Sequence, residues 1–394
     1  MKEIYIDNAA TTKINEEVLD EMIPYFTNYY GNPSSLHNFG IIAKNTIDES
    51  KNKISKILNC NSNEIIFTGS GTESDNLAIL GYCRRNKNKG NHIITTTIEH
   101  KAVLESFKKL KKEGFEITYL KVNREGIINI EELKKSIKKE TIFISIIYAN
   151  NEIGVIQDIK TISEICKKKN VTIHIDACQA TNYLDIDVKK LNVDLMTISG
   201  SKIYGPKGIG ILYKNKNIEI EPIIYGGGQE NNLRSGTENI PYIVGITKAL
   251  ELNSENKELE NKRLTKLRNK LIEGLLEISE THLNGSKNNR LPNNVNISFL
   301  NIEGESLLLM LNEFGIYAST GSACSSKNLD ASHVVLALDL PIEIAHSSIR
   351  FSLGKETTNE DIDYIIKQTK EIVKKLRNMS PLKLKIENII KKEK

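Results

Sequence analysis

The chain has 394 residues, of which 39% are hydrophobic and 26% are charged, proportions typical of a globular protein with a large core. The 54 basic and 50 acidic residues leave a net charge of +4, which is too small to indicate binding to nucleic acid or to a membrane surface. The start MKEIYIDNAATT lacks the build of a signal peptide, and no run approaches the roughly 18 apolar residues of a membrane span, so we expect a cytoplasmic protein.

Short β-branched runs alternate with amphipathic stretches through the first part of the chain. Continuous apolar strands separated by helices indicate a largely parallel sheet that is covered on both faces, so we predict an α/β fold. Apolar residues that recur at intervals of three and four predict the intervening helices. The predicted strands are 64–68, 92–97, 141–149, 171–176, 194–199 and 208–213, and the predicted helices are 72–86, 100–113, 130–138 and 158–169.

A charged helix predicted over about 254–279 leads from this core into a second, smaller domain. That domain contains two further strand-like runs, 293–300 and 347–354, and ends in an amphipathic helix. The sequence therefore predicts two domains of unequal size.

Polar motifs follow the predicted strands, where α/β proteins bind their ligands. GSGT (69–72) opens a helix, and free backbone N–H groups with the Thr72 hydroxyl suit a phosphate group. A simple helix cap explains the same four residues equally well. The motif lacks the G-x-x-x-x-G-K-S/T spacing of a nucleotide-binding loop.

Two charged residues extend this pattern. His174 and Asp176 lie on the same side of a predicted strand, and a carboxylate that ends a buried strand requires a cation such as a protonated pyridine nitrogen. Lys202 stands next to a serine and before a glycine-rich turn, and a lysine is the usual covalent anchor of pyridoxal phosphate. Taken alone, Lys202 is more simply a surface lysine. The phosphate turn, the aspartate and the lysine together indicate a pyridoxal-phosphate site.

STGSACSSKNLD (319–330) places Cys324 among small polar residues, although unpaired cysteines are usually buried. Five cysteines without C-x-x-C spacing argue against a disulfide framework or a zinc site. We therefore interpret Cys324 as a reactive thiol on a flexible loop.

The sequence resembles the group I cysteine desulfurases of the NifS/IscS type, which are fold-type-I pyridoxal-phosphate enzymes of the class-V aminotransferase family. The resemblance runs from 7–12 to about 380–382. It implies a large cofactor-binding domain over 15–255, with a mainly parallel seven-stranded sheet sandwiched by helices. It also implies a smaller α+β domain, formed by 1–14 and 256–394, that carries the cysteine loop. The motifs that carry it are GSGTESDN, IEHKAV, YANNEIGV, HIDACQA, SGSKIYGPKGIG, GGGQE, RSGTENI, STGSACSS and AHSSIRFSLG.

The resemblance implies a role for individual residues in these motifs. Lys202 would hold pyridoxal 5'-phosphate covalently and move the α-proton of L-cysteine, and His100 would stack on the ring. Cys324 would take the sulfur atom as a persulfide, leaving L-alanine. Taken alone, His100, Asn151 and Arg350 are more simply a core histidine, a structural amide and a surface ion pair. Cofactor contacts are implied for Lys202, Gly71, Thr72, His100, Asn151, Asp176, Gln179, Ser199, Ser201 and Thr237, the last from the other subunit, and substrate contacts for Asn32, Asn151 and Arg350.

The match departs from the family at two positions near the cofactor. Ser201 replaces the usual histidine and adds no charge, so we expect weaker cofactor binding. Cys178 replaces a small residue, and we interpret it as a packing substitute. An aminotransferase or selenocysteine lyase on the same fold is an alternative, although an aminotransferase has no need of Cys324. A cofactor-bearing but inactive assembly partner is another.

The resemblance also implies the partners. We expect a homodimer that passes persulfide sulfur to an iron–sulfur scaffold protein or a tRNA thiouridylase, without direct contact with nucleic acid or membrane. No metal ion is expected in the free enzyme, although Cys324 could ligate a cluster during transfer.

Overall fold

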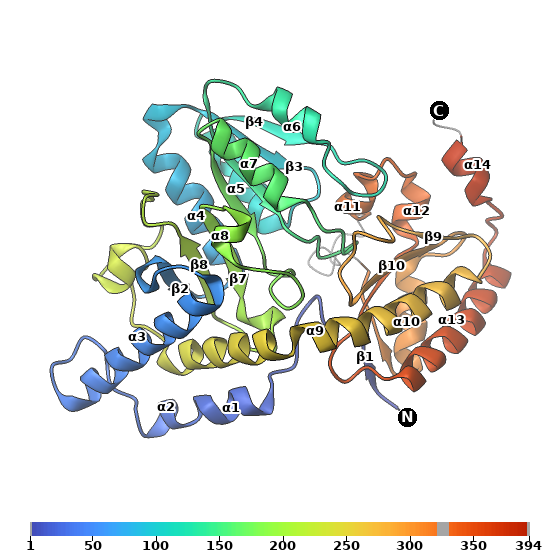
Figure 1. The fold of residues 1–394 in the computed structure, drawn as a ribbon. Coiled ribbons are helices and arrows are strands. Elements are labelled where there is room, and N and C mark those ends of the chain that lie inside the picture. Colours follow the sequence, from blue (N-terminus) through green and yellow to red (C-terminus); the bar gives the residue numbers. More distant parts are fainter. Residues whose placement is uncertain (1, 321–330, 392–394) are drawn as a thin grey trace.

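The computed structural model describes residues 2–320 and 331–391 and contains a seven-stranded sheet at its centre (Figure 1). Its strand order is β2-β8-β7-β6-β5-β3-β4, and neighbouring strands are parallel except that β8 is antiparallel to β2 and to β7. The predicted α/β class with a mainly parallel sheet is confirmed. The strands are β2 (Ile65–Thr68), β3 (His92–Thr96), β4 (Glu116–Leu120), β5 (Thr141–Ile147), β6 (Thr172–Asp176), β7 (Leu195–Ser199) and β8 (Gly210–Lys214).

Helices cover both faces of this sheet, which explains why most of its strands are continuously apolar. On one face, α4 (Gly71–Arg85) and α5 (Lys101–Lys112) pack in a cluster with Phe143 and Leu195. The other face packs against the larger hydrophobic cluster, to which α3 (Asn38–Leu58), α7 (Ile159–Lys168) and α9 (Ile240–Leu276) contribute. The remaining helices before α9 are α1 (Glu16–Met22), α2 (Pro24–Thr27), α3 (Asn38–Leu58), α6 (Ile130–Ser136), α7 (Ile159–Lys168), α8 (Val188–Leu191) and the 3-10 turns Ser62–Glu64, Lys87–Lys89, Gly200–Lys202 and Gln229–Asn232.

Two smaller sheets lie beyond the central one. The first is antiparallel, with the order β12-β10-β9, and the second pairs β1 in parallel with β11. The β1–β11 pair places the N-terminus of the chain beside its C-terminal third. The elements of this region are β1 (Ile4–Tyr5), β9 (Thr281–Leu283), β10 (Asn294–Phe299), α10 (Gly304–Glu313), β11 (Ile316–Tyr317), α11 (His333–Leu336), α12 (Ile342–His346), β12 (Ser348–Ser352), α13 (Asn359–Met379) and α14 (Ile386–Lys391).

Helix α9 (Ile240–Leu276) connects the two regions and runs along both in Figure 1. It contacts α1 and α3 on one side and α13 and β10 on the other. The prediction that this helix begins near residue 254 was wrong. Asn239 accepts a hydrogen bond from the Tyr242 N–H and caps the helix at its true start. The domain limits near residues 14 and 255 stay a prediction, and 255 falls inside this continuous helix.

Strand β4 was not predicted, because its residues are partly exposed and alternate in polarity at the edge of the sheet. In the described part of the chain, no helix is both long and apolar enough to cross a membrane.

Candidate active site

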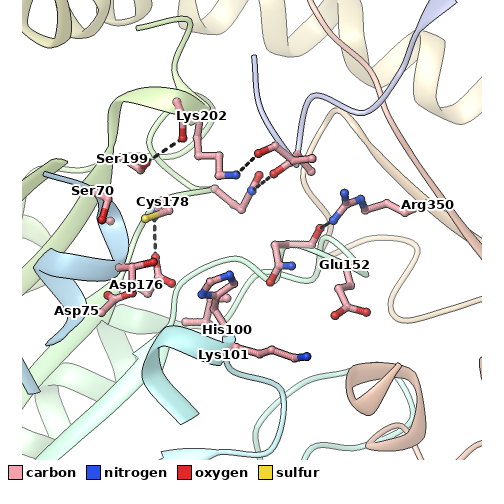
Figure 2. Close-up of a pocket in the computed structure, with 18 of the residues that line it drawn as sticks. Ser70, Asp75, His100, Lys101, Glu152, Asp176, Cys178, Ser199, Lys202 and Arg350 are labelled. Carbon is pink, nitrogen blue, oxygen red and sulfur yellow. Dashed lines mark hydrogen bonds between the residues drawn. The ribbon is translucent and has the colours of Figure 1, made fainter. Parts of the chain in front are cut away.

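A cavity of about 310 Å³ opens at the carboxyl ends of the strands, where polar motifs follow β2, β3, β5, β6 and β7 (Figure 2). It collects the predicted site residues Gly71, Thr72, His100, Asn151, Asp176, Gln179, Ser199, Ser201, Lys202 and Arg350. The other residues that line it are Ala9, Ala10, Ser70, Asp75, Lys101, Ile147, Glu152, Cys178 and His333.

One end of the cavity is formed by the first turn of α4. Ser70 caps the helix by accepting a hydrogen bond from the Glu73 N–H at 3.1 Å, and the N–H groups before it have no intrahelical acceptor. A Cβ atom on Gly71 would lie 2.8 Å from the Cys178 Sγ and 3.2 Å from the Ser199 Cβ, so this position requires glycine. Free N–H groups, the helix dipole and nearby serine hydroxyls fit a phosphate group.

The Asp176 carboxylate lies at the end of β6 and accepts the Cys178 N–H at 2.9 Å. His174, on the same strand, does not supply a positive charge to it. Both imidazole nitrogens of His174 contact hydroxyl groups, those of Ser145 and Thr197, and burial lowers the pKa of His174 to about 3. A protonated ring nitrogen of a bound cofactor suits this carboxylate.

Lys202 follows β7 in a short 3-10 turn and extends into the cavity (Figure 2). Its Nζ donates a hydrogen bond to the carbonyl oxygen of Ala10, and its own carbonyl accepts one from Asn182 at 2.6 Å. Gln179 donates to the carbonyl of Ala9 at 2.8 Å. The segment after β1 therefore lies directly against the lysine that the sequence singled out.

Two imidazoles line the cavity. His100 caps α5, where its Nδ1 accepts the Ala102 N–H at 3.1 Å. In the neutral ring Nε2 then carries the proton. The Nε2 of His333 lies 3.1 Å from the carbonyl oxygen of Glu99. Sequence analysis missed His333, because ASHVV resembles the start of an ordinary helix.

Arg350 enters from β12 and is only 2% exposed. Its Nη2 pairs with Asp7 at 2.7 Å, and its Nη1 donates to the carbonyl of Asn151 at 3.0 Å. Its Nε is buried and has no hydrogen-bond acceptor among the described residues. An unused N–H of a buried guanidinium that lines the cavity suits the carboxylate of an amino acid.

Two predicted residues, Asn32 and Thr237, are not at this cavity of their own chain. Asn32 is exposed, and its side chain accepts the Ser34 N–H at 2.9 Å. Thr237 lines a separate cavity of about 190 Å³. Cys324 lies outside the described residues. On either side of that undescribed segment, Ser319 exchanges two backbone hydrogen bonds with Arg350, and His333 lines the cavity.

Comparison with known proteins assigns the family. Residues 4–365 match the aminotransferase class-V family. The cysteine desulfurase IscS of Clostridium botulinum strain Hall is 52% identical over 384 residues, which is 97% of each chain. This chain belongs to the IscS cysteine desulfurases of that family. The IscS of Methanosarcina thermophila is 52% identical over 381 residues, covering 97% of this chain and 94% of that protein.

The fold comparison agrees with this assignment. A solved NifS-like protein superposes with a TM-score of 0.90 at 40% identity, covering 95% of this chain and all of that one. Members of this family depend on pyridoxal phosphate, and this chain is a pyridoxal-phosphate-dependent cysteine desulfurase. The helix turn at Gly71, the Asp176 carboxylate and the Lys202 amine fit the phosphate, ring nitrogen and aldehyde of that cofactor. No cluster of three or more potential metal ligands occurs among the described residues.

Proposed function

We propose that this cysteine desulfurase takes the sulfur atom of L-cysteine at the Lys202 cavity and carries it as a persulfide on Cys324. The main support for this proposal is that Lys202, Asp176 and Arg350 line the same cavity as the helix turn at Gly71. Each of these comes from a different element, so chance surface clustering does not explain them.

Within this proposal, Lys202 holds the cofactor covalently and Asp176 faces its ring nitrogen. The phosphate is held by Gly71, Thr72, Ser199 and Ser201, and by Thr237 of the partner subunit, while Gln179, His100 and Asn151 contact the ring. Bound pyridoxal phosphate supplies an electron sink that weakens the bonds at the α- and β-carbons of the substrate. Because Ser201 adds no charge where a histidine is usual, we expect weaker retention of the phosphate.

The chain's own residues bind the substrate and move its proton. Arg350 binds the carboxylate, with help from the Asn151 amide, and a buried guanidinium has little freedom to misplace it. The Lys202 amine takes the α-proton and returns a proton to the β-carbon. The Cys324 thiolate attacks the substrate sulfur, so that one S–S bond forms as the C–S bond breaks. Cysteine and one thiol give alanine and one persulfide, and no external oxidant or reductant is needed.

The test follows both products in one assay. Purified protein with cysteine and a reductant is expected to form alanine and sulfide in equal amounts. Cys324→Ala is expected to abolish both while leaving the yellow cofactor band intact. Lys202→Ala is expected to lose that band, whereas Lys207→Ala, an exposed lysine of the same turn, keeps activity and colour. Pyruvate and ammonia would indicate β-elimination instead, and bound cofactor without product would indicate an inactive assembly partner.

The acceptor is the next step of the proposal. We infer that the persulfide passes to an iron–sulfur scaffold protein or a tRNA thiouridylase in the cytoplasm, where reducing conditions keep an accessible thiol free. Persulfidated protein used as bait is expected to retain such an acceptor that Cys324→Ala does not retain. Equal capture by both proteins would contradict sulfur delivery from this thiol.

We also infer a homodimer. Large apolar side chains are exposed on α1, α2, the start of α3 and the connection between α2 and α3, where Tyr30 is 67% and Leu36 is 95% exposed. Single-chain soluble proteins rarely expose an apolar patch of this kind. In sedimentation, Tyr30→Glu with Leu36→Glu is expected to halve the mass, whereas Met379→Glu, exposed on the opposite part of the chain, is not. Unchanged mass in the double variant would contradict this interface.

A further inference from the structure

Asp75 is a buried acid of the cavity to which no role has been assigned. It lies in the first turns of α4, lines the cavity, and is 1% exposed. Figure 2 shows it next to Asp176, on the side of that residue away from Arg350. Its Oδ1 has no hydrogen-bond partner among the described residues. The nearest group able to carry a positive charge there is the Nε2 of His174, at 3.7 Å.

The groups around Asp75 leave a single negative charge in its neighbourhood. His174 is neutral, because its two nitrogens contact hydroxyl groups and burial lowers its pKa to about 3. Glu99, which ends the turn after β3, is fully buried, and burial raises its pKa to about 8. Cys178 faces the same acids from the turn after β6, and burial raises the pKa of its thiol well above the usual range. The Thr197 hydroxyl on β7 is uncharged, and its hydrogen bond to Asp75 lowers the pKa of that acid but is outweighed by burial. Cys178 lies between these acids and the Lys202 amine in Figure 2.

Two buried carboxyl groups that lie next to each other, as Asp75 and Asp176 do in Figure 2, oppose each other's ionisation, so the pair retains a proton. The Oδ1 of Asp176 accepts a backbone N–H, which stabilises a carboxylate, whereas the Oδ1 of Asp75 has no such donor. Burial, followed by the charge of Asp176, raises the pKa of Asp75 well above its usual range. The proton that the pair retains therefore belongs on Asp75.

We propose that Asp75 is a positioning residue, a neutral acid that packs against Asp176 and keeps it as the single negative charge facing the cofactor nitrogen. The inference rests on the proposed role of Asp176. An ionised carboxylate at position 75 would repel the Asp176 carboxylate and compete with it for the positive charge of the ring nitrogen. A small apolar side chain at position 75 would remove the polar group that packs against Asp176.

The test uses the full-length holoenzyme and three variants. Asp75→Asn keeps the shape and neutrality of the proposed protonated acid, whereas Asp75→Ala removes the side chain that packs against Asp176. The matched control is Asp194→Asn, because Asp194 is also buried but is ion-paired with Lys167. We expect one protonated-carboxyl infrared band to disappear in both Asp75 variants and to persist in Asp194→Asn. Glu99 contributes a separate band that both Asp75 variants retain.

Cofactor retention supplies a second readout. Asp75→Asn is expected to hold pyridoxal phosphate within about threefold of wild type. Asp75→Ala is expected to weaken the affinity for pyridoxal phosphate about tenfold. Removing a residue that positions a ligand-binding side chain commonly has an effect of this size. In Asp75→Ala, the visible absorption band of the bound cofactor is also expected to titrate at a different pH from the band in wild type and in Asp75→Asn.

The outcomes separate this inference from the proposed function. An unchanged infrared spectrum in Asp75→Asn, or a cofactor loss equal to that of Asp75→Ala, would overturn the role of Asp75. Alanine and sulfide formed normally alongside such a result would leave the proposed function standing. If the infrared band disappears as expected but the wild-type enzyme forms no alanine from cysteine, the proposed function is overturned instead.

Discussion

At the residue scale, Gly71 sets how closely α4 approaches the strand ends. A Cβ atom there would meet the Cys178 Sγ at 2.8 Å, closer than packed side chains allow. Cys178 is one of the positions, with Ser201 and Tyr183, at which we expect this chain to depart from the family pattern. The pair therefore offers a test of whether Cys178 acts through packing.

We predict that Gly71→Ala weakens cofactor binding and lowers stability by about 1–3 kcal/mol, because it overpacks the turn. Adding Cys178→Ala removes the closest contact and is expected to restore a large part of both losses. A double-mutant cycle on unfolding free energy and cofactor affinity measures the coupling. Additive effects would mean that the Cys178 sulfur does not limit the space at Gly71.

Few of the site residues were predicted from local chemistry, and His100, Asn151 and Arg350 were predicted only through the family resemblance. Asp176 ends an apolar strand, and Lys202 stands in a glycine-rich turn, so each is conspicuous in its own segment. Asp75 and His333 reach the cavity only through packing between elements. Asp75 was nevertheless detectable, because it follows Gly71 by four residues on one helix and so faces the same side. No local signal distinguished His333.

At the element scale, the segment between β1 and α1 holds the Lys202 turn in place. The Thr12 hydroxyl donates to the carbonyl of Ser201 at 3.1 Å and accepts the Tyr204 N–H at 2.8 Å. Tyr204 itself has a left-handed backbone, with a φ of 60°, so its conformation depends on such contacts. This segment is where the N-terminal part of the chain contacts the turn that carries Lys202, the proposed cofactor lysine.

We predict that Thr12→Val destabilises the protein by about 1–3 kcal/mol, because it leaves the buried Tyr204 N–H unpaired. The Ser201 carbonyl keeps its hydrogen bond from the backbone N–H of residue 12. Faster cofactor release is expected to accompany the loss. Thr11→Val is the matched control, since the Thr11 hydroxyl is buried without a hydrogen-bond partner in the described part of the chain, and its removal is expected to cost little. Equal losses in the two variants, measured by denaturant unfolding, would rule out a specific role for Thr12.

Element prediction succeeded for strands that are buried along their whole length. The strands β2, β5 and β6 are buried along their whole length and were found within about two residues, as expected for continuous apolar runs. The edge strand β4 and the early part of α9 were missed. Their residues depend on contacts with distant elements that periodicity does not contain.

At the scale of the whole molecule, buried acids couple stability to pH. Glu99 is fully buried, its Oε1 accepts the Thr96 hydroxyl and the Ile147 N–H, and burial raises its pKa to about 8. The folded state therefore binds more protons than the unfolded state between pH 4.5 and about pH 8. This contribution to stability is complete below that window and is lost as the pH rises through it.

We predict that Glu99→Gln removes this dependence, which amounts to roughly 3–5 kcal/mol across the window. His174 acts in the opposite direction, because its pKa is lowered to about 3 and it loses stability as the pH falls. The difference between the unfolding free energies of wild type and Glu99→Gln, taken at each pH, isolates the contribution of Glu99. Denaturant unfolding at saturating cofactor measures it, and parallel pH profiles for the two proteins would show that Glu99 is ionised in the folded state.

The most direct test of the account is peptide mass spectrometry of the protein after a brief exposure to L-cysteine. We predict one added sulfur atom on the peptide that contains Cys324 and none on the peptide that contains Cys178. The addition is expected to be absent in Lys202→Ala. Alanine formation without any sulfur added to Cys324 would contradict the account.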